Sequence, residues 1–393
     1  MSTLTRLALA VALGAAPAAS IAAEPPVEIP VVLPLTGNSA YDGQQGKATM
    51  DALEASTNRD GGIRGRPLKF VYYDDQSTPQ VAVQLTEVAL RSNPPVVLGS
   101  FPSANCLAMA PITKGKAVQY CFSPGIHPAF GADLFSSGIG TDSQALAMLR
   151  YAREHGWKRI AALVVTTSSG LDGEEQLKVA VALPENATKG MKLVGVEHFN
   201  PTDQTASAQI ERLRALDPQA LVLWGAGQQF GTALRAYSDA GLTIPVFTSD
   251  AVLSYQLMKQ FGTIVPKEIY FAGPIFLAGP NGSGIDRRVR DAIGKLYAAG
   301  TRAGFTVDLN SGNAWDPPSL VIDALRHVGP TANASSVHDW ILAQKSWAGA
   351  SGLYDFSNPA APQRGLTVQN ATIYRWNGGT QHFDAISKPG GLP

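Results

Sequence analysis

The sequence predicts an α/β protein built from two lobes, each a doubly wound parallel sheet. Short apolar runs of strand length alternate with segments of helical periodicity, and the loops between them are short. This alternation is typical of parallel strands joined by crossover helices. It occurs in two successive series, over 27–156 and 158–250, and a chain of 393 residues is long enough for two cores. Two such series favour two doubly wound lobes.

The first series contains four strands and four helices. Apolar runs predict strands at 27–35, 67–75, 94–100 and 117–123. Spacing of apolar residues every three to four positions predicts helices at 44–62, 78–92, 105–115 and 143–156. The first of these helices runs into Gly61 and Gly62, and glycine is the usual residue just past a helix end.

The second series repeats the same alternation. Apolar runs predict strands at 158–167, 191–199, 220–225 and 244–250. Helical periodicity predicts the helices between them at 172–183, 207–216 and 228–241. Each strand is therefore followed by a segment long enough to return the chain to the same end of the sheet.

The pattern changes after a last apolar run at 267–277. Three helices follow with no strand between them, at 286–300, 317–329 and 337–346. These helices need a sheet to cover, and the earlier lobe supplies one. The segment 367–379 alternates like an antiparallel edge strand. The chain is therefore expected to cross between the lobes more than once.

The N-terminus and the charge balance limit the classes of function. Residues 1–23 have one Arg, an apolar run too short to span a bilayer, and small residues before the end. This pattern predicts a cleaved signal peptide and a protein released into a bacterial periplasm. Lys plus Arg and Asp plus Glu both number 31. No basic stripe of the kind that binds nucleic acid is present, so no nucleic-acid partner is expected.

The chain has two cysteines, Cys106 and Cys121. The first falls near a predicted helix start and the second at the end of the next strand. In an oxidising compartment such a pair can form a disulfide. Two small buried core residues are the alternative, and the sequence leaves both open.

The ends of the predicted strands carry small, neutral hydrogen-bonding residues. Ligands of open α/β sheets lie at these carboxyl ends, beside helix N-termini. The residues in question lie at 36–39 with Tyr41, at 99–105, at 123–127, at 166–170, at 225–228 and at 249–250. Such ends bind a carboxylate or a carbonyl group well. Each residue alone has a structural alternative, because Ser and Asn before a helix often act only as caps.

Cofactor and catalytic motifs are weak or missing. Gly225-x-Gly227-x-x-x-Gly231 resembles a dinucleotide fingerprint, but it lies in the middle of the chain and has one residue too many. The six histidines show no metal-ligand spacing, and no GxSxG elbow occurs. We therefore expect no cofactor, no metal and no enzymatic activity, with an exported enzyme as an alternative.

Several segments together resemble the periplasmic solute-binding proteins of ABC importers, of the leucine/isoleucine/valine-binding type. The resemblance covers nearly the whole mature chain. It rests on "PLTGNSAYDGQQGKATMDALE", "NRDGGIRGRPLKFVYYDDQSTPQVAV", "VVLGSFPSAN", "FSPGIHP" and "FTSDAVLS". The late segments "AWDPPSLVIDALRHVGP" and "WAGASGLYDFSNPAAPQRGL" are also similar to this family.

The resemblance implies a clamp of the type I fold, with two lobes joined by a three-strand hinge. The N-terminal lobe would comprise 27–143 plus 275–350, and the C-terminal lobe 144–274 plus 351–393. A monomer would close on a small-molecule ligand between the lobes and then dock on a membrane ABC permease complex. A sensory protein with the same clamp is an alternative.

The resemblance also assigns roles to residues. Tyr41 would line the pocket for the ligand side chain, and Ser103, with main-chain N–H groups such as that of Ala104, would hold the ligand carboxylate. Gly125 and His127 would contact the carboxylate and amine, and Asp250 would accept the α-amino group. Strand ends of the second lobe add two more candidates, Ser169 and Gly227.

Two departures from the family pattern bear on the ligand. His127 stands where amino-acid binders have Thr, and the short loop 168–171 replaces a loop that carries Tyr. An amino acid, branched-chain or otherwise apolar, is the expected ligand, because a buried Asp250 needs a cation or a donor. An aromatic or aliphatic carboxylate, an amide or a urea-like solute is the alternative.

Overall fold

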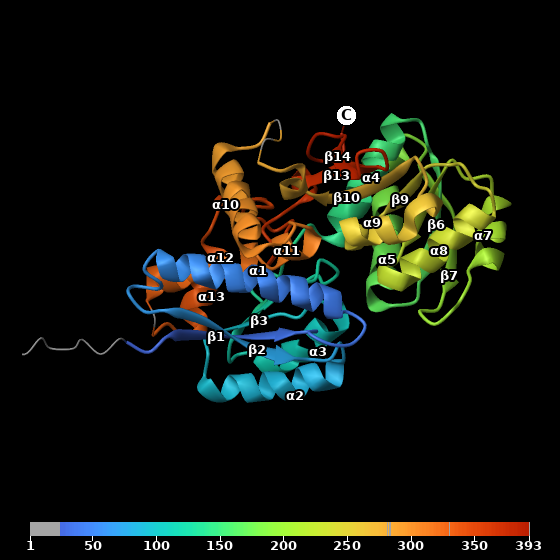
Figure 1. Cartoon of the computed structure of the whole chain (residues 1–393). Helices are drawn as coiled ribbons and strands as arrows, with labels where there is room; N and C mark the ends of the chain where they lie inside the picture. Colours follow the sequence, from blue (N-terminus) through green and yellow to red (C-terminus); the bar gives the residue numbers. More distant parts are fainter. Residues whose placement is uncertain (1–23, 281, 283, 330, 393) are drawn as a thin grey trace, which may run out of the picture.

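The computed structural model describes residues 24–280, 282, 284–329 and 331–392. It contains two large sheets, each covered by helices, that lie side by side (Figure 1). The predicted fold class is confirmed. The signal peptide predicted over 1–23 lies outside the described residues.

The first sheet has five parallel strands in the order β2-β1-β3-β4-β5. The strands are β1 (Val27–Leu33), β2 (Leu68–Asp74), β3 (Val96–Leu98), β4 (Val118–Cys121) and β5 (Leu134–Ser136). The helices that follow the first three are α1 (Ala40–Arg59), α2 (Pro79–Ala89) and α3 (Ser103–Thr113). Strand β5 was not predicted, because its sequence LFS has only two apolar residues between polar residues and glycines.

The second sheet has seven strands in the order β14-β13-β10-β9-β8-β6-β7. Five pair in parallel: β6 (Arg159–Val165), β7 (Lys192–Phe199), β8 (Ala220–Trp224), β9 (Val246–Thr248) and β10 (Ile269–Pro274). Two are antiparallel, β13 (Ala371–Asn377) and β14 (His382–Ala385). The tail strand predicted at the edge is therefore antiparallel, but β14 covers it and forms the edge itself.

The helices between 141 and 261 belong to the second sheet. They are α4 (Thr141–Glu154), α5 (Ser168–Ala182), α6 (Pro184–Ala187), α7 (Ser207–Arg214), α8 (Gly227–Asp239) and α9 (Tyr255–Phe261). Short 3-10 turns complete the chain: η1 (Leu90–Ser92), η2 (Asp250–Val252), η3 (Gly262–Ile264), η4 (Ile275–Ala278) and η5 (Val368–Asn370). We call this sheet and its helices the second half of the molecule.

The late helices return to the first sheet, where α10 and α11 pack on α1, α12 packs on β3 and α13 packs on β4. Their bounds are α10 (Arg287–Ala303), α11 (Leu309–Asn313), α12 (Asp316–Val328) and α13 (Ala334–Leu342). A hairpin of β11 (Trp347–Gly349) and β12 (Gly352–Tyr354) packs on α10 and α12. With the first sheet and α1–α3, these elements form the first half. The chain thus crosses between the halves three times, after β5, after β10 and after β12.

Two helices begin four residues earlier than the sequence predicts. α1 starts at Ala40 instead of 44, and α5 starts at Ser168 instead of 172. Each carries a glycine in its first turn that lets the helix approach the preceding strand. A Cβ on Gly43 would lie 2.2 Å from the Pro34 carbonyl oxygen, and one on Gly170 would lie 2.0 Å from that of Val165. The glycines made these first turns look like loops in the sequence.

A buried arginine joins two of the crossings. Arg364, in the third crossing, is 4% exposed. Its guanidinium donates to the carbonyl oxygens of Ser137 (2.9 Å) and Gly138 (3.3 Å) in the first crossing. It also donates to those of Pro124 (2.9 Å) and Ile126 (2.6 Å) in the loop after β4. One side chain therefore fixes three separate segments where the halves meet.

Removing this side chain should destabilise the whole molecule. Arg364→Met would leave four carbonyls without their donor, and we expect the free energy of unfolding to fall by about 3–5 kcal/mol. Arg364→Lys should lose less, since an ammonium keeps the charge but lacks the planar fork. Urea unfolding measures both. Arg235→Met, an exposed change on α8, is the control and should stay within about 0.5 kcal/mol of the unmodified protein; an equal effect of both Met variants would contradict the role of Arg364.

Candidate functional site

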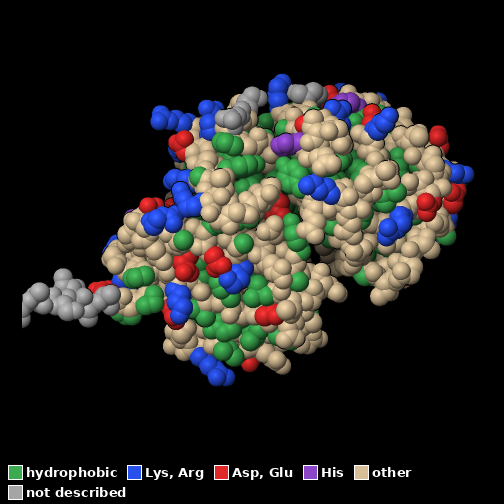
Figure 2. Space-filling model, in the orientation of Figure 1, with side chains coloured by type: hydrophobic (Ala, Val, Ile, Leu, Met, Phe, Trp, Pro, Cys, Tyr) green, Lys and Arg blue, Asp and Glu red, His purple; other side chains and the backbone are tan. Residues whose placement is uncertain are grey.

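A cavity of about 620 Å³ lies between the two halves, where the carboxyl ends of strands from both sheets meet. Figure 2 shows the surface hollowed between the halves. Its wall comes from the first turn of α1, the starts of α3 and α11 and the loop after β4 in the first half. From the second half it takes the starts of α5 and α8 and the segment from β9 into α9. No Lys, Arg or His of the described residues lines it.

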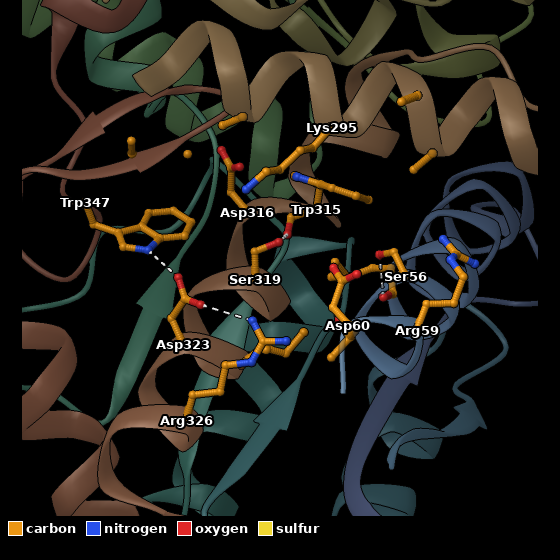
Figure 3. A pocket seen from close by; sticks show the side chains of 18 of the residues that line it. Ser56, Arg59, Asp60, Lys295, Trp315, Asp316, Ser319, Asp323, Arg326 and Trp347 are labelled. Atoms are coloured by element: carbon orange, nitrogen blue, oxygen red, sulfur yellow. Dashed lines mark hydrogen bonds and ion pairs between the residues drawn. The ribbon is translucent and has the colours of Figure 1, made fainter. Parts of the chain in front are cut away.

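A second cavity, of about 390 Å³, lies elsewhere in the first half, between α1, α10, α12 and β11. Figure 3 shows that Lys295, Arg326 and Asp323 line it, with Asp323 paired to Arg326 and to the Trp347 indole. None of the site residues predicted from the sequence is in its wall. The cavity between the halves is therefore the candidate ligand site.

Six of the eight predicted ligand-binding residues line the cavity between the halves: Tyr41, Ser103, Gly125, Ser169, Gly227 and Asp250. The first three come from the first half and the last three from the second. Two others do not line it. Ala104 exposes its side chain on α3, and His127 lies beside the cavity.

One end of the cavity gathers donors for an anion. The Ser103 and Ser123 hydroxyls are 2.6 Å apart, and the Gly125 N–H donates to Ser123 Oγ at 3.4 Å. Ser103 is also the first residue of α3, whose first N–H groups have no partner within the helix. Hydroxyl groups and a helix N-terminus together favour a carboxylate.

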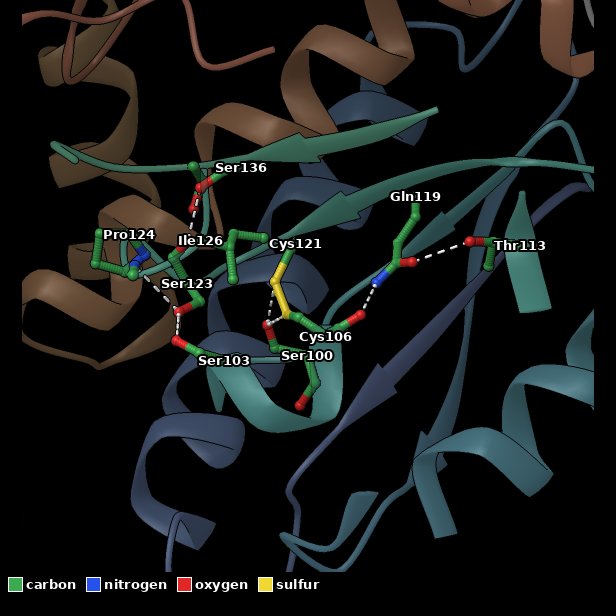
Figure 4. The surroundings of a disulfide bond; sticks show 12 residues. Ser100, Ser103, Cys106, Thr113, Gln119, Cys121, Ser123, Pro124, Ile126 and Ser136 are labelled. Atoms are coloured by element: carbon green, nitrogen blue, oxygen red, sulfur yellow. Dashed lines mark hydrogen bonds between the residues drawn. A yellow bond between two sulfur atoms is a disulfide. The ribbon is translucent and has the colours of Figure 1, made fainter. Parts of the chain in front are cut away.

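A disulfide lies directly behind this end (Figure 4). Cys106 and Cys121 are bonded, with their Cα atoms 6.0 Å apart, so the structure contains the first of the two alternatives left open by the sequence. Both sulfur atoms contact the Ser100 carbonyl oxygen, at 3.1 and 3.3 Å. Because the bond ties the first turn of α3 to the end of β4, it holds Ser103 and Ser123 in register.

The opposite wall carries a buried acid. Asp250 begins η2 and is 1% exposed, and its N–H donates to Gln144 Oε1 at 3.0 Å. Its Oδ2 has no hydrogen-bond partner within the described chain. Burial raises the pKa of this carboxyl to about 7, against the opposing effects of Gln144 and Arg364. A buried oxygen in a cavity wall that lacks a donor is suited to an ammonium or N–H group of a ligand.

Sequence reasoning missed Asp42 and its partner Asn310, which both line the cavity. Asn310 Nδ2 donates to Asp42 Oδ1 at 2.9 Å, and burial raises the pKa of Asp42 to about 6. The adjacent Tyr41 hydroxyl donates to Asp308 Oδ2 at 2.8 Å, and burial raises its pKa to about 12. The only signal for Asp42 was its place beside Tyr41, and none linked it to α11.

His127 connects the two halves and is not among the residues that line the cavity, so its expected contact with the ligand stays a prediction. Its Nε2 lies 2.8 Å from Asp172 Oδ1, on α5 in the second half, and 3.1 Å from Thr141 Oγ1. Thr141 also donates to Asp172. The segment 168–171, expected to be a short loop, is the first turn of α5.

The model of the periplasmic binding protein family matches residues 26–381 of this chain. The chain belongs to that family. The match spans both halves and all three crossings, so it covers the whole candidate site.

Known members of the family match over most of their length. Leu/Ile/Val-binding protein homolog 2 of Brucella abortus (strain 2308) is 25% identical over 306 residues, which are 76% of this chain and 81% of the relative. An extracellular ligand-binding receptor of Rhodopseudomonas palustris HaA2 has the same fold, with a TM-score of 0.78 and 19% identity over 91% of this chain and 99% of its own. The substrate-binding protein LivJ of Streptococcus pneumoniae in complex with isoleucine has a TM-score of 0.75 and 16% identity, over 92% and 98%.

This periplasmic binding protein is therefore of type I, as the resemblance implied. Its relatives are binding proteins and not enzymes, so the alternative of an exported enzyme is set aside. The family is extracytoplasmic. Within the described part of the chain, no helix combines the length and apolar character needed to cross a bilayer.

The disulfide should contribute measurably to stability. The cysteines are 15 residues apart, and closing a loop of this size is worth about 3 kcal/mol in the unfolded-state model. Reduction with dithiothreitol should lower the free energy of unfolding by that order, as measured by urea unfolding. The double variant Cys106→Ser, Cys121→Ser should have the lower value already and should not respond to dithiothreitol. An unmodified protein with the same stability in both conditions would contradict the prediction.

Proposed function

We propose that this protein is the solute-binding component of an ABC importer and that it closes on an α-amino acid. One observation carries the proposal: an unpartnered buried oxygen of Asp250 is in one wall, and the Ser103–Ser123 hydroxyl pair at the α3 N-terminus is in the other. An α-amino acid has one ammonium and one carboxylate, which match these two ends. The names of its relatives, Leu/Ile/Val-binding homologues, support an amino acid as the ligand.

The two halves act as the jaws in this proposal. The lobes would be 27–143 plus 275–350 and 144–274 plus 351–393, as the resemblance implies. The ligand carboxylate binds the first lobe, and closure brings Asp250 of the second lobe onto the ammonium. Only contacts made in the closed state favour closure. The His127–Asp172 pair joins a loop of the first half to α5 of the second, so it is one contact between the two jaws.

The closed monomer then presents both lobes to a membrane permease, which this chain does not include. Carboxylates without an amine, simple amides and urea-like solutes are the alternative ligands. Unlike amino acids, carboxylates without an amine have no ammonium group for Asp250 to bind, so a change of Asp250 distinguishes the two classes of ligand. A periplasmic location after signal cleavage is part of the same proposal.

Asp250→Asn tests the ammonium contact. Loss of a charge-assisted hydrogen bond should weaken amino-acid binding by about 10- to 100-fold, the equivalent of roughly 1.5–3 kcal/mol. The matching 2-keto acids, which lack the amine, should bind the variant no worse than the unmodified protein. Isothermal titration calorimetry on the mature protein measures both, with the exposed change Asp239→Asn, at the end of α8, as control. Unchanged amino-acid binding would remove Asp250 from the site.

The same carboxyl predicts a pH dependence. Its pKa is raised to about 7 in the empty protein, so it is protonated below that pH and cannot pair with an ammonium. Amino-acid affinity should be level above about pH 8 and fall towards tenfold per unit below pH 6. The empty protein should show the opposite trend and lose stability as pH rises through about 7, because burial disfavours the charged form. Asp250→Asn should flatten the binding profile near pH 7; a profile identical to that of the unmodified protein would contradict this.

Ser103→Ala tests the carboxylate end. Loss of one hydroxyl donor should weaken an amino acid by about 1–3 kcal/mol. The amine that lacks the carboxylate should bind both proteins equally, which makes it the matched control ligand. An equal loss for both ligands would mean that Ser103 shapes the protein and does not hold the anion.

A further inference from the structure

The cavity between the halves has a second carboxylate that the proposed contacts do not use. Asp42 and Asp250 both line it, one from each half, and no basic side chain of the described residues joins them there. Asp250 and the Ser103–Ser123 pair account for the ammonium and carboxylate common to all α-amino acids. Asp42 is therefore available to the part of the ligand that differs from one amino acid to another.

One oxygen of the Asp42 carboxylate has a hydrogen-bond partner within the described chain, and the other has none. Asn310 donates to its Oδ1 at 2.9 Å, and no hydrogen bond or ion pair within the described chain reaches its Oδ2. Burial raises its pKa to about 6, with Asp308 adding to the rise, so it is largely ionised at neutral pH. A carboxylate oxygen in such surroundings pairs best with N–H donors or a cation.

The position of Asp42 is fixed by a double connection between two helices. Tyr41 and Asp42 are consecutive residues of α1. The Tyr41 hydroxyl donates a hydrogen bond to Asp308, just before α11, and Asp42 accepts one from Asn310, on α11. Asp308 in turn caps α11 by accepting from the Ser311 N–H at 3.0 Å and from its hydroxyl at 2.9 Å. The acid is thus part of a rigid wall and does not lie on a free loop.

The second half completes the surroundings of this corner. The Ser254 side chain, at the start of α9, lies near Tyr41 and partly opposes the burial that raises the pKa of this phenol to about 12. The next residues of α9, Gln256 and Leu257, line the cavity together with Leu309. An apolar stem can therefore pass Leu257 and Leu309, while polar groups surround its end.

We propose that Asp42 binds the end of the ligand side chain and selects α-amino acids whose side chains end in N–H donors. This class comprises ammonium, guanidinium, ureido and carboxamide side chains. It departs from the apolar side chain expected from the sequence. The inference rests on the proposed function for the α-ammonium and carboxylate and adds a specificity for the side chain.

The unmodified mature protein provides the first test, by calorimetry with matched ligands. Lysine, arginine and ornithine represent charged donors, citrulline and glutamine neutral donors, and norleucine and leucine the apolar controls. We expect at least one donor series to bind tenfold or more tightly than norleucine. Preference for the charged series would identify a cationic side chain, and preference for the neutral series an amide or ureido group. Tighter binding of leucine or norleucine would overturn the inference.

Variants of Asp42 provide the second test. Asp42→Ala should weaken the preferred donor series by tenfold or more and leave norleucine unchanged or slightly tighter. Asp42→Asn should weaken the binding of amino acids with charged side chains more than that of amino acids with neutral ones. It replaces the Ala variant if that variant folds poorly. Asp239→Asn, an exposed acid at the end of α8, is the matched control.

The two proposals fail in different ways. If Asp250→Asn weakens amino acids but Asp42→Ala affects donor and apolar side chains equally, the amino-acid function stands and the Asp42 inference falls. If no amino acid binds the unmodified protein, the proposed function falls and the inference falls with it.

Discussion

The whole site depends on the direction of parallel strands. A strand that pairs in parallel with its neighbour must be followed by a crossover that returns the chain to the starting edge. The parallel strands of one sheet therefore end at the same edge, and the helices that follow them begin there. In this protein two such edges face each other, so the starts of α1, α3 and α11 oppose those of α5, α8 and α9. Ser103 and Asp250 are far apart in the sequence and become opposite walls for this reason alone.

The sequence predicted most strands and most helices because apolar runs and helical spacing survive in local segments. It failed where close packing or distant partners decide. Gly43 and Gly170 looked like loop residues, although each allows a helix to begin against its strand. The contact of Asn310 with Asp42 spans 268 residues, and those of Arg364 span 226 to 240, so no local pattern announces them. The short helix α11 and the strand β5 gave too little periodicity to detect.

In the centre of the molecule, the buried arginine lies at the crossings and two of the acids lie in the cavity wall. The guanidinium of Arg364 is surrounded by backbone carbonyls, and Asp142, Asp172 and Asp250 act on it through space. It opposes the rise in the pKa of Asp250 and does not line the cavity. Asp250 has an unpartnered buried oxygen in one wall of the cavity, and Asp42 lies in the opposite wall with Asn310 as its neutral neighbour. The cavity wall therefore carries the carboxyl groups of Asp42 and Asp250, and the buried guanidinium of Arg364 lies behind that wall.

The disulfide between Cys106 and Cys121 restrains one end of the cavity. It spans the first turn of α3 and the end of β4, the two segments that bring Ser103 and Ser123 together. The hydroxyl contact and the pairing of β3 with β4 also align these segments, and the disulfide adds a covalent tie to them. The bond that adds stability to the first half therefore also restrains the end of the cavity where hydroxyl donors gather.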